Sequence, residues 1–260
     1  MTDRALQDEV IRALADAPYR GSTEWRRRRL ADPDRVERYA RFLARHFYFE
    51  RIVQFFKYSR ALARVTGRWP EAVLKAAAFE ALFATMVLGS RETAEAVTRL
   101  VTEHVAAGGD GRIPYLKDLL RYQEAMMVVE AGPRVWRDPE EASLVGSGGS
   151  ARQDRPAMVE GTVLLELSYD LPAVLPKLLQ PWSEVPQVPE RQTRLLVARS
   201  PHGRVAVARG DATVAAVMGL ADGTRTVDEL AAGAGLAVGR LQETLRSLVE
   251  LGAVGFSTGS

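Results

Sequence analysis

The sequence predicts an α+β protein that consists of an N-terminal helical bundle followed by a small winged-helix-like module. In the first half, apolar residues recur at the spacing of amphipathic helices, and Gly or Pro marks the connections. In the second half, short strands separated by turn residues come before three small helices. Between the halves lies a stretch of Gly, Ser, Pro and charged residues without periodicity, which is typical of a linker. We therefore expect a helical bundle at 1–132, a flexible linker at 133–158 and a winged-helix-like domain at 159–260.

The helices of the first half have recognisable start and stop signals. Asp32 can cap a helix that has Pro33 at its first position, and nothing breaks the helical pattern before Gly67. Four or five helices with short connections indicate a compact bundle. The helices are expected at Asp3–Ala15, from Pro33 to Gly67, from Pro70 to about Leu88, from Ser90 to about Ala106 and at Tyr115–Glu130.

The second half changes to a pattern of strands and short helices. A strand at Thr162–Tyr169 and a helix at Leu171–Leu179 are followed by a connection with three prolines. The expected elements after it are the strands Thr193–Arg199 and Arg204–Ala208, the helices Asp211–Leu220, Thr226–Ala234 and Val238–Leu251, and the strand Ala253–Phe256. This is the order of a winged helix, or of the related three-strand, three-helix modules that bind peptides. Such modules bind a linear partner, either DNA or peptide, and seldom carry out chemistry.

The composition argues against several classes of function. The chain has no Cys, which excludes disulfides, thiolate metal sites and a cysteine nucleophile. No apolar run approaches the ~20 residues that span a bilayer, and the first 16 residues are too charged for a signal peptide. We therefore expect a cytoplasmic protein without a membrane partner.

The sequence contains no recognisable catalytic set. His46 and Glu50 share a helix face, and Glu103 precedes His104, but neither pair has the Glu-x-x-His spacing of a di-iron bundle. Nucleophile elbows, phosphate loops and dinucleotide fingerprints are also missing. The sequence therefore predicts a protein that is not an enzyme by itself and holds no metal or cofactor.

Positive charge is concentrated in the first half of the chain. The net charge is only +2, yet residues 25–68 contain 13 Lys or Arg against four Asp or Glu. Such a block can attract an acidic protein, nucleic acid or a membrane surface. A solvated helix face has the same pattern and is the favoured interpretation.

Two stretches of sequence resemble a known family. The first comprises ERYARFLARHFYFERIVQFFKYSRAL (Glu37–Leu62), the following FEALFATMVLGSRETAEAVTRLVTEHV and IPYLKDLLRYQEAMMVV (Ile113–Val129). Its string Pro114–Ala125 is the most telling part. It resembles the helical domain of partner proteins of multinuclear non-haem iron oxidative enzymes, which modify cysteine-bearing peptides in pathways of the methanobactin and thiaglutamate type. The second stretch, Gly203–Val254 with the run Asp222–Leu230, is similar to the recognition elements of peptide-modifying pathways.

The resemblance implies a division of labour between chains. This protein would bind the leader segment of a ribosomally made precursor peptide and present it to a separate iron enzyme in a heterodimer. The iron would belong to that enzyme and the substrate thiol to the precursor, so this chain would need no cofactor of its own.

The expected peptide site combines a strand edge with the last helix. An extended peptide can add itself to an exposed strand, and Arg204–Ala208 is the candidate edge. In the last helix Leu241, Leu245 and Leu248 lie on one face, which is also what an ordinary core helix shows. The candidate peptide-binding residues are Arg204, Val205, Ala206, Val207, Ala208, Arg240, Leu241, Leu245, Arg246 and Leu248.

The expected docking surface for the enzyme is the aromatic part of the helical bundle. Aromatic residues and Arg are enriched in interface hot spots, although other helices of the bundle could bury the same rings. The candidate docking residues are Phe47, Tyr48, Phe55, Phe56 and Tyr58, in a segment that also contains Phe42 and Phe49, together with Tyr115, Arg121 and Tyr122 of a later helix.

Two other functions fit the same pattern of elements. A winged helix can place a helix in the major groove of DNA as a transcriptional regulator. Here the last helix balances Arg240 and Arg246 with Glu243 and Glu250, which gives little attraction for phosphates, so nucleic acid is not the expected partner. The third alternative is a structural adaptor without peptide specificity.

Overall fold

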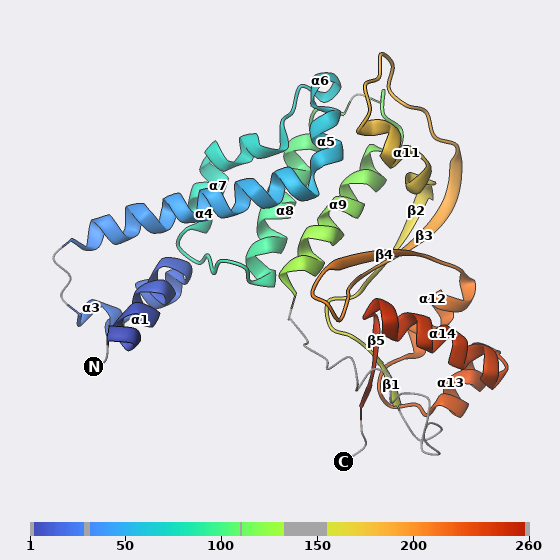
Figure 1. Ribbon diagram of the computed structural model, residues 1–260. Coiled ribbons are helices and arrows are strands. Elements are labelled where there is room, and N and C mark those ends of the chain that lie inside the picture. Colours follow the sequence, from blue (N-terminus) through green and yellow to red (C-terminus); the bar gives the residue numbers. More distant parts are fainter. Residues whose placement is uncertain (1–2, 29–31, 110, 133–154, 258–260) are drawn as a thin grey trace. The chain divides into compact units, whose positions relative to one another are not determined.

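The computed structural model describes residues 3–28, 32–109, 111–132 and 155–257 of the chain (Figure 1). The chain divides into two compact units. Unit 1 comprises Met1–Met127 and Leu175–Pro186, and unit 2 comprises Val128–Val174 and Gln187–Ser260. The predicted mixture of an N-terminal helical region with small sheets is confirmed. Most of the predicted linker lies outside the described residues.

The regular elements described in the N-terminal part of the chain are helices, joined by turns and one isolated β-bridge between Asp16 and Val87. Two four-residue helices, α2 and α3, follow α1 and were not predicted; their capping residues, Asp16 and Ser22, accept hydrogen bonds from backbone amides three residues ahead. The helices are α1 (Asp3–Ala15), α2 (Ala17–Arg20), α3 (Thr23–Arg26), α4 (Pro33–Phe55), α5 (Lys57–Ala61), α6 (Ala63–Thr66), the 3₁₀ helix η1 (Pro70–Lys75), α7 (Ala77–Leu82), α8 (Arg91–Ala106) and α9 (Leu116–Ala131).

The continuous helix predicted from Pro33 to Gly67 is wrong, because the chain leaves the helix at Phe56 (φ −97°, ψ 23°). The side chain of the buried Gln123 in α9 explains the break. Its Oε1 accepts hydrogen bonds from the backbone N–H groups of Tyr58 and Ser59, both at 3.1 Å, and its Nε2 donates to Ser59 Oγ. Gln123 thus replaces helical acceptors, so the buried amide of Ser59 and the partly buried amide of Tyr58 stay bonded although the helix is interrupted.

The second helix predicted as continuous, from Pro70 to about Leu88, is also interrupted. It begins as η1, passes through the extended residue Ala76 (ψ 147°) and resumes as α7. The break brings Phe79 and Phe83 into the core, where Phe79 packs edge-on against the Tyr48 ring. Packing of the rings therefore overrides a local sequence that contains no Gly or Pro at the break.

The C-terminal part contains two small antiparallel sheets and four helices. The elements are β1 (Arg155–Met158), β2 (Val163–Tyr169), α11 (Leu171–Leu178), β3 (Glu190–Arg199), β4 (Val205–Gly210), α12 (Ala212–Leu220), α13 (Val227–Ala234), α14 (Val238–Leu251) and β5 (Val254–Ser257). The larger sheet has the order β2-β3-β4, and in the smaller sheet β5 pairs with β1. The last four residues of the predicted linker are therefore a strand, whose partner lies about 100 residues further along the chain.

Helices α12 and α14 lie against one face of the β2-β3-β4 sheet, and α13 packs on these two helices (Figure 1). Leu196 and Ala198 of β3 point toward the helices, whereas the alternate residues Leu195 and Val197 are buried on the opposite face. Helix α14 ends at Gly252, which has φ 83° and lies so close to β3 that a Cβ atom there would be 2.1 Å from the carbonyl oxygen of Arg199. The end of α14 is thereby fixed against β3.

The run Asp222–Leu230 forms a turn that leads into α13. The Asp222 carboxylate accepts hydrogen bonds from the hydroxyl and the backbone N–H of Thr224, and these bonds lower the pKa of Asp222. Thr226 and Glu229 form a capping box, and the hydrogen bonds from the Thr226 backbone and hydroxyl lower the pKa of Glu229. Both carboxylates thus stabilise the folded state at pH values above their ordinary pKa. This contribution to stability is lost as the pH falls through their lowered pKa values in the folded protein.

Candidate functional site

Strand β4 forms an edge of the larger sheet, and no described strand pairs with its outer side. The Ser200 N–H donates to the Arg204 carbonyl oxygen at 2.8 Å, which makes these two residues a hydrogen-bonded pair. Such pairs alternate along an antiparallel ladder. With the register Leu196 to Ala208 and Val197 to Val207, the peptide groups of Val207 and Arg209 therefore face away from β3. The outer edge presents backbone donors and acceptors to a further strand.

A groove of about 340 Å³ lies beside this edge, between β4 and α14. Its walls combine aliphatic side chains from β3, α12 and α14 with hydroxyl and charged groups of α14. The lining residues are Leu196, Ala208, Arg209, Asp211, Val214, Arg240, Glu243, Thr244, Ser247, Leu248 and Leu251. A strand added to β4 would direct every second side chain into this groove.

The structure brings part of the predicted peptide site together. Of those residues, only Ala208, Arg240 and Leu248 line the groove. Leu241 and Leu245 are buried in the core of unit 2, which corrects their assignment as peptide contacts. Arg246 is exposed but does not line the groove, and the strand residues Arg204, Val205, Ala206 and Val207 contribute the edge itself.

Several groove residues were missed by the sequence reasoning. Thr244, Ser247 and Leu251 lie on α14 at a spacing of three and four residues, and Val214 comes from α12. Leu251 follows Leu248 on the same side of the helix, so the signal was present in the sequence. It could be interpreted only once the side of α14 that covers the core was known.

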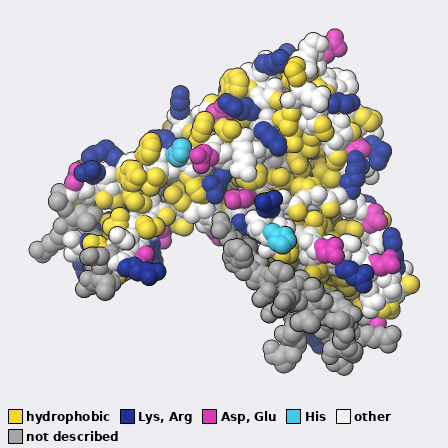
Figure 2. Space-filling model, in the orientation of Figure 1, with side chains coloured by type: hydrophobic (Ala, Val, Ile, Leu, Met, Phe, Trp, Pro, Cys, Tyr) yellow, Lys and Arg dark blue, Asp and Glu magenta, His cyan; other side chains and the backbone are white. Residues whose placement is uncertain are grey.

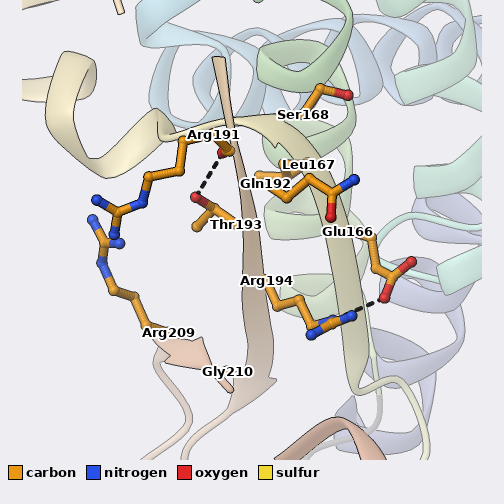
Figure 3. A pocket seen from close by; sticks show the side chains of 9 residues that line it. All are labelled: Glu166, Leu167, Ser168, Arg191, Gln192, Thr193, Arg194, Arg209 and Gly210. Carbon is orange, nitrogen blue, oxygen red and sulfur yellow. Dashed lines mark hydrogen bonds and ion pairs between the residues drawn. The ribbon is translucent and has the colours of Figure 1, made fainter. Parts of the chain in front are cut away.

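A second cavity, of about 390 Å³, involves the end of the sheet where β3 begins and β4 ends (Figure 3). Its walls include three arginines, Arg191, Arg194 and Arg209. Arg209 donates a hydrogen bond of 2.6 Å to the nearly buried Asp170, and a nitrogen of Arg191 lies 3.8 Å from the other oxygen of the same carboxylate. Arg194 instead pairs with Glu166 at 2.9 Å.

Most of the predicted docking residues belong to the core of unit 1. Tyr48, Phe56 and Tyr115 are fully buried, and Phe55 and Tyr122 are nearly so. Burial raises the pKa of both Tyr115 and Tyr122 to about 12, and for Tyr122 the nearby Tyr58 adds to the effect. These five rings are therefore not placed to contact a partner. The remaining three, Phe47, Tyr58 and Arg121, are at least partly accessible.

The exposed aromatic surface of unit 1 lies elsewhere on α4. Tyr39, Phe42, His46 and Phe49 recur at a spacing of three, four and three residues, and we call them the α4 stripe. Tyr39, Phe42 and Phe49 are 51%, 59% and 43% exposed, and the Phe42 ring stacks between those of Tyr39 and His46. Figure 2 shows hydrophobic side chains gathered over α1 and the first half of α4, at the left of the view.

An apolar groove of about 550 Å³ adjoins the α4 stripe. Val10 and Leu14 of α1 and Val36 of α4 form its walls together with Tyr39 and Phe42, and Arg35 and Arg38 lie beside them. The spacing of the α4 stripe is that of a coiled-coil seam, which suits a helix laid alongside α4. Arg35 and Arg38 place positive charge beside this groove.

Several arginines of the basic block, among them Arg41, Arg45 and Arg60, pair with acidic side chains. Glu37 accepts from Arg20 at 2.7 Å and from Arg41 at 2.9 Å, and Glu80 pairs with both Arg41 and Arg45. In α14, Arg240 lies 3.4 Å from Glu243. Such pairing reduces the attraction of both regions for phosphate groups.

Neither a protein-family model nor a curated protein matches this chain. Within the described ranges, no three His, Asp or Glu side chains are grouped so that they could hold a metal ion. No described helix combines the length and the apolarity needed to cross a membrane. The site must therefore be interpreted from its own geometry.

Proposed function

We propose that this chain is a non-catalytic partner subunit that binds the leader of a ribosomally made precursor peptide. It would present that peptide to a multinuclear non-haem iron enzyme that modifies cysteine. Unit 2 is, in this proposal, a winged-helix-like peptide-recognition module. The observation that carries the proposal is the edge of β4 with a groove between it and α14. An added strand would gain main-chain hydrogen bonds from Val207 and Arg209, while the groove would select its side chains.

Titration of the full-length chain with candidate ligands tests the proposal. The probe is the synthetic leader of a short cysteine-containing precursor encoded beside this gene, and isothermal calorimetry measures its affinity. We expect saturable binding that an excess of duplex DNA does not reduce. Preferential binding of duplex DNA would instead support a transcriptional regulator, and binding of neither ligand would leave a structural adaptor.

The substitution Phe42→Ser tests where the iron enzyme docks. Phe42 is the most exposed hydrophobic ring of the α4 stripe. If the enzyme covers this surface, Phe42→Ser should weaken the complex about tenfold or more, because buried aromatic anchors dominate interface energies. Analytical co-purification of the two chains, followed by calorimetry, measures the change.

Trp69→Ser is the matched control for the docking surface. Trp69 is also about half exposed and aromatic, but it lies outside the α4 stripe and packs against Arg60. It should leave the affinity unchanged. Equal effects of Phe42→Ser and Trp69→Ser, or none from either, would show that the enzyme does not dock on the α4 stripe.

A further inference from the structure

The second cavity of unit 2 contains two arginines that share one carboxylate. Arg191 and Arg209 extend to the same side in Figure 3, with their guanidinium groups close to one another, away from the Arg194–Glu166 pair. Both reach Asp170, whose side chain is only 8% exposed, whereas Arg191 and Arg209 are 66% and 50% exposed. We call this cluster the arginine pocket: Arg191 and Arg209 line the cavity, and Asp170 pairs with both behind its wall-forming residues.

The arginine pocket carries a net positive charge. Two guanidinium groups face a single carboxylate, and each guanidinium has five N–H donors in a fixed plane. Asp170 lies within hydrogen-bond distance of Arg209 and at 3.8 Å from Arg191. A second carboxylate would balance the remaining charge, and arginine pairs are well suited to such a group.

The position of Arg209 on the edge strand connects the arginine pocket to the peptide groove. Arg209 lines both cavities, and its backbone faces the outer edge of β4. In register, Arg209 lies opposite Leu195, on the sheet face away from α12–α14, whereas Ala208 lies opposite Leu196 on the helix-covered face. In an added strand, the residue beside Arg209 would place its side chain on the arginine side. Its two chain neighbours would point toward the groove.

We propose that the arginine pocket selects an acidic side chain of the bound peptide. In the peptide, the residues directly before and after this acidic residue place apolar side chains in the groove beside α14. The recognised segment therefore has an apolar–acidic–apolar pattern with period two. This inference rests on the proposed function, because it assumes that a peptide strand adds to β4.

Selection from a displayed library of random 12-residue peptides tests the pattern with the full-length chain. Peptides selected by the wild-type protein should show two apolar positions separated by one Asp or Glu. A selected peptide is then synthesised with Asp or with Asn at that position. The Asp form should bind about two- to fivefold more tightly, which is the range expected for a partly exposed ion pair.

Two variants of unit 2 separate the arginine pocket from general charge effects. Arg191→Gln leaves the Arg209–Asp170 pair in place, so the fold should be retained. The Asp and Asn forms of the peptide should then bind this variant with nearly equal affinity. Arg194→Gln removes an arginine of the same cavity that pairs with Glu166 instead, and it should keep the full preference. Thermal unfolding of both variants checks their folding.

The outcomes distinguish a failure of the arginine pocket from a failure of peptide binding itself. Apolar enrichment without the acidic residue, or an Asp preference that survives Arg191→Gln, overturns the role of the arginine pocket while peptide binding stands. Loss of the preference in Arg194→Gln as well would also overturn it, because the effect would then be general attraction. If the wild-type protein selects no peptide, the proposed function fails and this inference fails with it.

Discussion

Replacing Val207 by proline should reduce the affinity for the leader peptide about tenfold or more while unit 2 stays folded. The Val207 N–H faces the outer edge of β4, so its loss removes a bond to the peptide and none to β3. Proline is tolerated on strand edges because its missing N–H faces outward there, and its ring would obstruct an added strand. One lost main-chain bond together with this obstruction corresponds to at least ~1.4 kcal/mol, or tenfold. Calorimetry with the synthetic leader measures the change.

Val207→Thr is the control for this substitution. Threonine keeps the backbone N–H and the β-branched shape, and Val207 is partly exposed, so affinity and stability should stay close to those of the wild-type protein. If Val207→Pro bound the leader as tightly as Val207→Thr does, strand addition to β4 would be ruled out. The groove alone would then have to account for binding.

Gly252→Ala should destabilise unit 2 by about 3 kcal/mol or more. An alanine there has to adopt φ near 83°, which costs about 1–2 kcal/mol, and its Cβ would lie 2.1 Å from the carbonyl oxygen of Arg199. Because Gly252 directly follows α14 and Arg199 ends β3, the clash can be relieved only by moving the end of α14 away from β3. Hydrogen exchange of the α14 and β3 amides measures the loss of protection within unit 2.

Substitutions at two other glycines separate the cost of the left-handed backbone conformation from the cost of the steric clash. Gly235 ends α13 at φ 66° with open space around a Cβ, so Gly235→Ala should cost only the ~1–2 kcal/mol of the left-handed conformation. Gly239 lies within α14 with nothing near its Cβ position, so Gly239→Ala should stabilise by about 0.5–1 kcal/mol. If Gly252→Ala cost no more than Gly235→Ala, the close approach of α14 to β3 would not be a source of stability.

The sequence predicts the fold best where local signals decide it. The capped and regularly spaced helices α1, α8, α9, α12, α13 and α14 lie close to their predicted bounds. The errors occur where distant residues decide the local conformation. Gln123 interrupts the helix at Phe56 from 67 positions away, and β1 exists because β5 pairs with it. No local pattern near residue 56 or 155 carries that information.

For the candidate site, too, the sequence predicts the elements but not which helix face is buried. The sequence locates the edge strand and the helix beside it, since strand and helix periodicities are local. It cannot say which side of α14 meets the core, because the faces with Leu241 and Leu251 both contain leucines. The aromatic segment of α4 is similar: Tyr48 is buried by the other helices, whereas Phe42, six residues earlier, remains exposed.

The division of the chain into units that exchange segments has a consequence for synthesis on the ribosome. Leu175–Pro186 belongs to unit 1, where Leu178 is buried, the Tyr115 hydroxyl donates to the Pro186 carbonyl oxygen, and Arg64 stacks on the Trp182 ring at 3.6 Å. Unit 2 has meanwhile begun at Val128. The N-terminal helices therefore cannot acquire their full set of contacts until Pro186 has left the exit tunnel. The nascent chain must hold an incomplete first unit while most of the β2-β3-β4 sheet is still untranslated.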